Sequence, residues 1–176
     1  MIAFTVAGVT LGTALAGCTA GSGPAPSPAP AASPTYPLPP RPVRLSETPV
    51  AGATAVSEQT SVAVIGVRAH MPLLAGTHAD FQPRGEFDRL RVVVQNDSRT
   101  FLSLTPADML LVTADGTAHR PDGQAMVIKR QPEAIELGSQ GRVEFDLYYD
   151  VPTGSKLRLL RLAGFDPKLE IPLPAT

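Results

Sequence analysis

The thiol of Cys18 carries the most distinctive chemistry in this sequence. Cys18 is the single cysteine among 176 residues, which excludes an intramolecular disulfide and a zinc cage built from cysteines. The three residues before it, Leu15, Ala16 and Gly17, are one branched apolar residue and two small ones. This arrangement makes Cys18 the first candidate for a covalent modification.

The residues before Cys18 form an apolar run. Residues 1–17 contain no charged side chain, and about 17 residues is the short limit for a membrane-spanning helix, which favours a signal-peptide h-region. Signal n-regions normally carry Lys or Arg. Their absence here means either that the real start codon lies upstream or that export tolerates the loss.

Residues 15–18 resemble the lipobox of bacterial lipoproteins. In that motif the small side chains fit the peptidase that cuts before the cysteine, and the thiol faces a lipid donor. The resemblance implies cleavage before Cys18, a diacylglyceryl group on its sulfur and an N-acyl chain such as palmitate. Two or more acyl chains anchor a protein stably, so we expect a lipid anchor at the extracytoplasmic face of the cell membrane. The alternative is a plain signal peptide or anchor with an accidental cysteine.

Residues 18–57 are expected to form a flexible, Pro/Ala-rich linker. Between Thr19 and Pro42, prolines are interleaved with Ala, Ser and Gly, a composition that cannot form a packed core. Such a segment samples polyproline II, and 24 residues at about 3.1 Å each would reach roughly 75 Å. Recognition by an aromatic-lined groove or O-glycosylation are the alternatives to a simple spacer.

Residues 58–176 show the two-residue period of β-strands. Arg142–Val151 is the clearest case, with apolar residues alternating with Glu144, Asp146, Tyr148 and Asp150. This pattern predicts one buried face and one solvated face. Leu90–Val94 and Leu169–Leu173 alternate in the same way, and Pro172 suits an edge strand.

Other segments give shorter or less regular signals. Ser61–Val67 and Asp108–Thr113 are apolar on both faces and predict buried strands. The apolar phase slips within Lys156–Leu162, which predicts a β-bulge or else a short helix. Ala125–Arg130 and Ala134–Leu137 are weaker predicted strands. About seven strands with turn residues between them are typical of a β-sandwich.

Several short motifs resemble a bacterial family of extracellular immunoglobulin-like domains of unknown function. The motifs are Gly85-Glu86-Phe87, Leu90–Asn96, Asp115-Gly116, Gly141–Phe145 and Val151-Pro152. The resemblance implies an all-β, immunoglobulin-like antiparallel β-sandwich over residues 58–176. The family is similar in fold to a secreted mycobacterial immunoprotective antigen. The resemblance implies no catalytic residues and no cofactor. Phe87 and Phe145 are then core candidates and Asn96 a turn residue.

The remaining polar residues give weak signals for chemistry. His70, His78 and Asp80 could converge on a metal, but their spacing is loose. Asp88, Asp115 and Asp122 lack the spacing of an EF-hand. The motifs of a serine or cysteine nucleophile are missing, so we expect no enzyme activity and no metal site.

Charge and composition limit the classes of partner that the chain could bind. The formal net charge is −1, which gives no basic excess for binding nucleic acid. Arg89, Arg91 and Arg99 could line an outer sheet face and contact anionic lipid or wall polymer, although solvated charges are the usual explanation. We therefore expect a membrane-tethered module that binds or scaffolds a cell-envelope protein or polymer, with strand addition at a sheet edge as the easiest route. The alternative is an accessory ligand- or metal-binding lipoprotein of a transport system.

Overall fold

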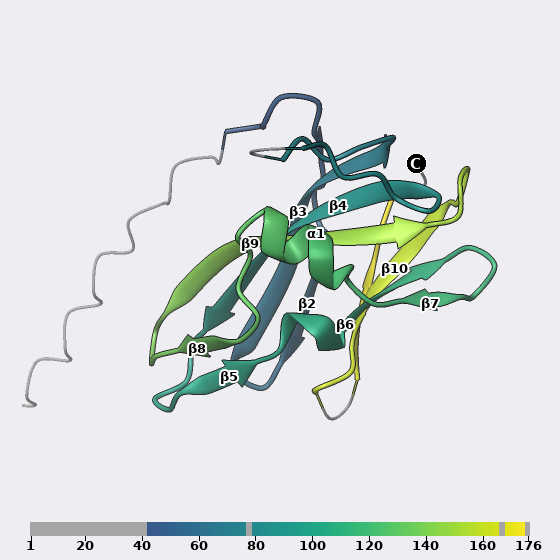
Figure 1. The fold of residues 1–176 in the computed structure, drawn as a ribbon. Coiled ribbons are helices and arrows are strands. Elements are labelled where there is room, and N and C mark those ends of the chain that lie inside the picture. The colour runs from purple at the N-terminus through teal and green to yellow at the C-terminus, as the bar shows by residue number, and fades with distance from the viewer. Residues whose placement is uncertain (1–41, 77–78, 166–167, 175–176) are drawn as a thin grey trace, which may run out of the picture. The chain divides into compact units, whose positions relative to one another are not determined.

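The structure of the chain is a computed structural model that describes residues 42–76, 79–165 and 168–174. It confirms the predicted fold class: the chain forms an all-β antiparallel sandwich (Figure 1). The signal peptide, Cys18 and the linker as far as residue 41 lie outside the described residues.

The first sheet has five strands in the order β1–β3–β4–β9, and β2 also pairs with β3. Every pairing is antiparallel. The strands are β1 (Thr48–Pro49), β2 (Thr54–Ser57), β3 (Thr60–Met71), β4 (Glu86–Asn96) and β9 (Arg142–Val151). The predicted strand at 142–151 is therefore confirmed, and it lies at one edge of this sheet.

The second sheet has the order β11–β10–β6–β7, and β5 and β8 form a separate two-stranded sheet. The pairing of β10 with β6 shifts between Leu157 and Leu159, which confirms the predicted bulge. The predicted edge position of Pro172 is confirmed as well, because β11 ends the sheet. The strands are β5 (Leu102–Leu104), β6 (Met109–Thr113), β7 (Ala118–His119), β8 (Ile135–Leu137), β10 (Leu157–Leu162) and β11 (Leu169–Pro172), with the 3-10 helix η1 (Pro106–Asp108) before β6.

The core lies between the two larger sheets. The predicted core residues Phe87 and Phe145 are 0% and 4% exposed. Tyr149 is also fully buried, and its hydroxyl donates a hydrogen bond of 2.8 Å to the carbonyl of Met109, so β9 is joined to the start of β6. Full burial of a large apolar side chain stabilises a fold by about 1.5–3 kcal/mol.

The folded unit begins earlier than the sequence predicted. Residues 48–57 were expected to belong to the linker, but they form β1 and β2, which pair with β3. Thr48 pairs with Val67, and Thr54 pairs with Ala63. These strands are short, and their side chains are mostly exposed. Their place in the sheet depends on backbone hydrogen bonds, so the sequence shows no apolar alternation that would have predicted them.

One predicted strand is a helix instead. Residues 125–130 were expected to form a weak strand, but α1 spans Gly123–Ile128. Its first turn is capped by Asp122, whose side chain accepts a hydrogen bond of 2.7 Å from the backbone N–H of Ala125. A capping aspartate satisfies one of the unpaired N–H groups of a first turn, which favours the helix over the extended form.

Asn96 does more than end a strand. It is 1% exposed, and its Nδ2 atom donates to the carbonyl oxygens of Thr100, Leu137 and Gly138 at 2.8, 3.1 and 3.0 Å. Its Oδ1 atom accepts from the N–H of Ser98 at 3.1 Å. Asn96 therefore joins the turn after β4 to the loop between β8 and β9.

Replacing Asn96 with Ala is expected to lower the free energy of unfolding by about 2 kcal/mol, because buried carbonyls then lose their donor. Asn96→Asp is expected to cost more, since a carboxylate would face the same carbonyl oxygens. Urea denaturation measures both, and Gln95→Ala, a neighbour with an exposed hydrogen bond, is the control. An Asn96→Ala midpoint equal to that of the wild type would contradict this role.

Candidate functional site

The residues predicted to carry the covalent chemistry, Leu15, Ala16, Gly17 and Cys18, lie outside the described residues, and so does His78. In the part of the chain that is described, no helix has the length and hydropathy to cross a membrane.

The outer face of the first sheet differs from the prediction. Asp146 and Tyr148 of β9 were expected to face solvent, but they are 8% and 6% exposed. Arg89 and Arg91 of β4 were expected to be solvated or to form a surface patch, but they are 9% and 4% exposed. Arg99 is exposed. Of the three arginines in the basic patch that the sequence suggested, Arg89 and Arg91 are therefore covered and only Arg99 is exposed.

The cover is the segment that leads into β1. Its Glu47 side chain is fully buried. Glu47 Oε2 lies 2.7 Å from Arg89 Nη2, and Oε1 lies 2.6 Å from Arg91 Nη2. The second contact has poor hydrogen-bond geometry, but its short separation makes it an ion pair. One carboxylate thus contacts two buried guanidinium groups.

Arg44 extends this arrangement towards the edge of the sheet. Its Nη1 atom donates to both carboxylate oxygens of Asp146, at 2.9 and 2.7 Å, and its Nη2 atom contacts Glu144 at 3.1 Å. Arg91 also reaches Glu144, at 3.3 Å. We call the set the outer-face charge network; its members are Arg44, Glu47, Arg89, Arg91, Glu144 and Asp146.

The register of the sheet explains why Glu47 fits there. Gly66 of β3 pairs with Arg91, which pairs with Asp146, so these three residues form one row across the outer face. Gly66 has no side chain, and a Cβ built on it would lie 2.3 Å from Glu47 Cδ. The absent side chain leaves the space that the Glu47 carboxylate occupies.

A second polar cluster lies where β3 ends and β4 begins. His70 Nδ1 lies 2.8 Å from Glu86 Oε1, and the backbone N–H of His70 donates to Asp88 Oδ1 at 2.9 Å. One candidate ligand atom from each of these three residues lies within 4.8 Å of the others. The structure therefore groups His70 with Glu86 and Asp88 rather than with Asp80.

A bulge positions His70 in this cluster. The register of β3 against β4 shifts between Arg68 and Met71, and His70 has a φ of 57°. This left-handed conformation is uncommon outside glycine, and bulges of this kind re-aim a side chain. The hydrogen bond that the Glu86 carboxylate accepts from the imidazole raises the pKa of His70 above its ordinary value. Burial raises the pKa of Asp88 from 3.8 to about 6.

Asp115 and Asp122, which were considered together with Asp88 and lack the spacing of an EF-hand, have local roles. Asp115 accepts hydrogen bonds from the Thr113 hydroxyl and from Thr117 in the turn between β6 and β7. These bonds lower the pKa of Asp115 to about 2. Asp122 caps α1. Both therefore stabilise a turn or a helix end rather than joining Asp88.

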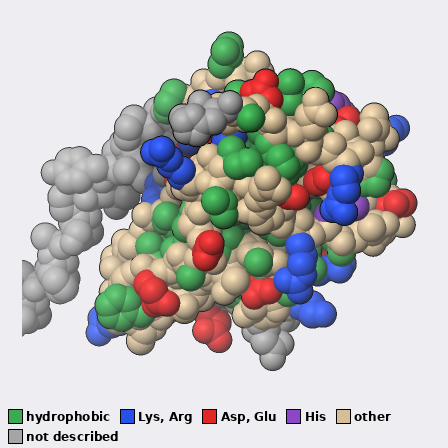
Figure 2. Space-filling model, viewed as in Figure 1, with side chains coloured by type: hydrophobic (Ala, Val, Ile, Leu, Met, Phe, Trp, Pro, Cys, Tyr) green, Lys and Arg blue, Asp and Glu red, His purple; other side chains and the backbone are tan. Residues whose placement is uncertain are grey.

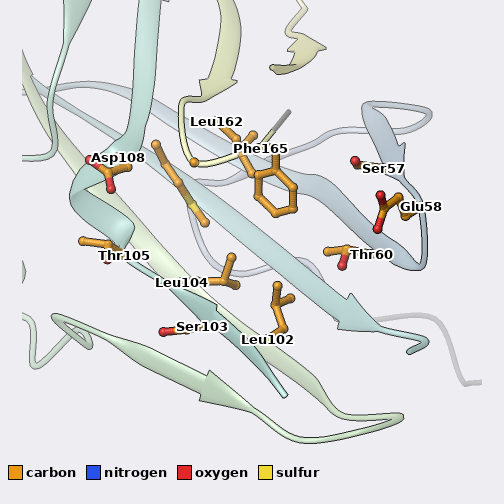
Figure 3. Close-up of a pocket in the computed structure, with 12 residues that line it drawn as sticks. Ser57, Glu58, Thr60, Leu102, Ser103, Leu104, Thr105, Asp108, Leu162 and Phe165 are labelled. Atoms are coloured by element: carbon orange, nitrogen blue, oxygen red, sulfur yellow. The ribbon is translucent and has the colours of Figure 1, made fainter. Parts of the chain in front are cut away.

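A groove of about 330 Å³ lies beside η1, between the β2–β3 hairpin and β5 (Figure 3). Leu104, Leu162 and Phe165 supply apolar surface, and Glu58 and Asp108 supply carboxylates at its rim. The groove has the mixture of apolar walls and a few polar groups found in ligand sites, and it shares no lining residue with the His70 cluster.

Part of the free edge of β9 is covered. The Asp146 N–H donates to the side-chain oxygen of Gln131 at 2.7 Å, and the carbonyl of Tyr148 accepts from the N–H of Asp122 at 2.8 Å. Covered edges resist pairing with another chain. Strand addition, which we expected to be the easiest binding route, is therefore hindered at this part of β9.

The view of the surface in Figure 2 shows acidic and basic side chains interspersed with apolar ones, rather than a field of one sign. This agrees with the formal net charge of −1. On this face, charge gives no reason to expect a polyanionic partner.

Comparison with known proteins supports the fold. The chain matches no family model and no curated protein. Among solved structures, it is similar to the yjhA protein from Bacillus subtilis, with a TM-score of 0.53 and 17% identity over 72% of this chain and 100% of that one. It is also similar to a conserved hypothetical protein from Bacillus anthracis, with a TM-score of 0.48 and 18% identity over 71% of this chain and 95% of that one. At these identities, the likeness to the first of them describes the fold alone.

Proposed function

We propose that this chain is a lipid-anchored protein of the extracytoplasmic membrane face, in which a β-sandwich serves as a binding or scaffolding module of the cell envelope. Lipid on Cys18 fixes the location, and the Pro/Ala-rich linker supplies reach. The sandwich presents a contact surface to an envelope protein or wall polymer.

The observation that carries the proposal is the way the chain enters the domain. Arg44 and Glu47 fasten the segment after the linker to the outer face of the sheet, and the carbonyl of Pro42 accepts a hydrogen bond of 3.2 Å from Arg91. A tethered module needs a defined attachment point, because a frayed entry would add slack and lower the effective concentration of the module at its partner. The ion pairs supply such a point directly after the proline-rich sequence.

A second candidate function is that of an accessory lipoprotein that binds a metal or small ligand for a transport system. The grouping of His70 with Glu86 and Asp88 favours it. This candidate keeps the lipid anchor and assigns the sandwich a ligand instead of a macromolecular partner.

Replacing Cys18 with Ala is expected to abolish acylation. In cells fed an alkyne analogue of palmitate, the wild-type chain should incorporate the label and sediment with membranes. The Cys18→Ala chain should incorporate none, because its N-terminal region lacks the thiol that accepts the diacylglyceryl group. Ser22→Ala, which changes a nearby linker residue and leaves the lipobox intact, is the matched control. Equal labelling of wild type and Cys18→Ala would refute the proposed anchor.

A further inference from the structure

We infer that His70, Glu86 and Asp88 form a binding site for a divalent transition-metal ion, with Zn²⁺ as the best match. The inference concerns a site in the folded domain, and it holds whether or not the chain is lipid-anchored. It rests on the convergence of three ligand side chains and on a buried carboxylate oxygen that the protein leaves unpaired.

The three ligand atoms converge from two neighbouring strands. Glu86 and Asp88 are two residues apart on β4 and so project to one side of the strand, while the β3 bulge turns His70 towards them. Their ligand atoms all lie within 4.8 Å of one another. Metal–ligand distances of about 2.0–2.2 Å allow one ion to contact atoms separated by up to about twice that length.

The independent observation is the state of Asp88. This residue is 0% exposed, and its Oδ1 atom accepts the N–H of His70. Its Oδ2 atom is buried and has no hydrogen-bond partner among the described residues. A buried carboxylate oxygen without a partner is costly. A cation held against His70 and Glu86 would provide the missing interaction.

The donor set narrows the choice of ion. One imidazole nitrogen and two carboxylate oxygens suit Zn²⁺ better than Mg²⁺ or Ca²⁺, which prefer ligand sets made of oxygen alone. Three protein ligands leave the fourth tetrahedral position open, as in zinc sites that bind a water or a further ligand. The Gly154 N–H, which donates to Glu86 Oε1 at 2.9 Å, would orient that carboxylate in the way that outer hydrogen bonds orient metal ligands.

The alternative is a hydrogen-bonded cluster that holds the end of the sandwich together and binds nothing. It accounts for the contacts of His70 with Glu86 and with Asp88 Oδ1. It leaves Asp88 Oδ2 without a partner, and for that reason we favour the metal.

The test is a titration of the full chain with Zn²⁺, after purification in detergent without a histidine tag and removal of metals with a chelator. Cys18 is either lipidated or replaced by Ser, so that no free thiol competes. Calorimetry should give one Zn²⁺ per chain, and saturating Zn²⁺ should raise the Tm because the ion binds the folded form. Co²⁺ should give a visible absorption band of low-symmetry coordination at the same stoichiometry.

The variants identify the ligands. His70→Ala and Asp88→Asn are each expected to weaken Zn²⁺ binding by about 100-fold or more. Loss of a residue that only hydrogen-bonds a ligand lowers metal affinity by about 10- to 100-fold, and loss of a ligand should cost at least as much. His70 is exposed, so His70→Ala should fold normally. His119→Ala, at the other described histidine, should bind as the wild type does. Absence of a saturable heat in the wild type, or binding lost in His119→Ala but kept in His70→Ala, would overturn the assignment.

Discussion

Replacing Glu47 with Gln is expected to lower the free energy of unfolding by about 3–5 kcal/mol, the range measured when one partner of a buried ion pair is removed. Glu47 is fully buried between Arg89 and Arg91, whose side chains are 11% and 5% exposed. Gln keeps the shape of the side chain but removes its charge, so both buried guanidinium groups would lose this partner, and Arg91 would keep only its longer ion pair with Glu144, at 3.3 Å. Urea denaturation, followed by far-UV circular dichroism, measures the change in midpoint.

Glu136→Gln is the matched control, because it makes the same chemical change at an exposed position that bonds Ser103. Its effect should stay within about 0.5 kcal/mol, as for most surface substitutions. If the Glu47→Gln and Glu136→Gln chains unfold at the same urea concentration, the outer-face charge network does not hold the entry of the chain.

Gly66→Ala is expected to destabilise the domain by about 3 kcal/mol, at the upper end of the cost of overpacking a buried site. The new Cβ would lie 2.3 Å from Glu47 Cδ and 2.5 Å from its Oε1 atom. The carboxylate is held by two arginines and cannot move aside without breaking at least one of those contacts. The same denaturation assay reports this loss.

A double-mutant cycle separates this clash from a general effect of alanine in a strand. In a Glu47→Ala background the space beside residue 66 is free, so Gly66→Ala should cost almost nothing. Gly123→Ala is the control for the substitution itself, since a Cβ at Gly123 meets open space. Additive effects of the two substitutions at 47 and 66 would show that they do not act through a shared contact.

The sequence predicted those parts of the fold whose signal is local. The alternation in residues 142–151 predicted β9, and the slipped phase in residues 156–162 predicted the bulge of β10. Phe145 was recognised as a core residue because the two-residue period of residues 142–151 assigns it to the apolar face, whereas Phe87 was a core candidate only as part of the family resemblance. Residues 125–130 were assigned wrongly, because their apolar residues are compatible with a strand or a helix and the cap at Asp122 decides between them.

The solvated face predicted for β9 was wrong for a different reason. The residue that covers Asp146 is Arg44, which is 102 positions away in the chain. Periodicity shows that a face is polar, but it does not show what packs against that face. Arg89 and Arg91, two residues apart on one face of β4, were the available signal, and they marked that face without identifying Glu47 as their partner.

The polar cluster could be predicted only in part. His70 was considered as a metal ligand together with His78 and Asp80, the nearest possible ligands in sequence, but their loose spacing led us to expect no metal site. The β3–β4 register and its shift between Arg68 and Met71 bring His70 beside Glu86 and Asp88 instead. Glu86 and Asp88 lie in a strand within the segment that resembles the family motifs, and their two-residue spacing matches no metal-binding motif.

The most direct test of the proposed function is mass spectrometry of the N-terminal peptide of the mature chain, purified from membranes. We expect a peptide that begins at Cys18 and carries the mass of a diacylglyceryl group, with or without an additional acyl chain. A mature chain that begins elsewhere, or that begins at Cys18 without added lipid, would contradict the anchor. The sandwich would then be a secreted or differently tethered domain.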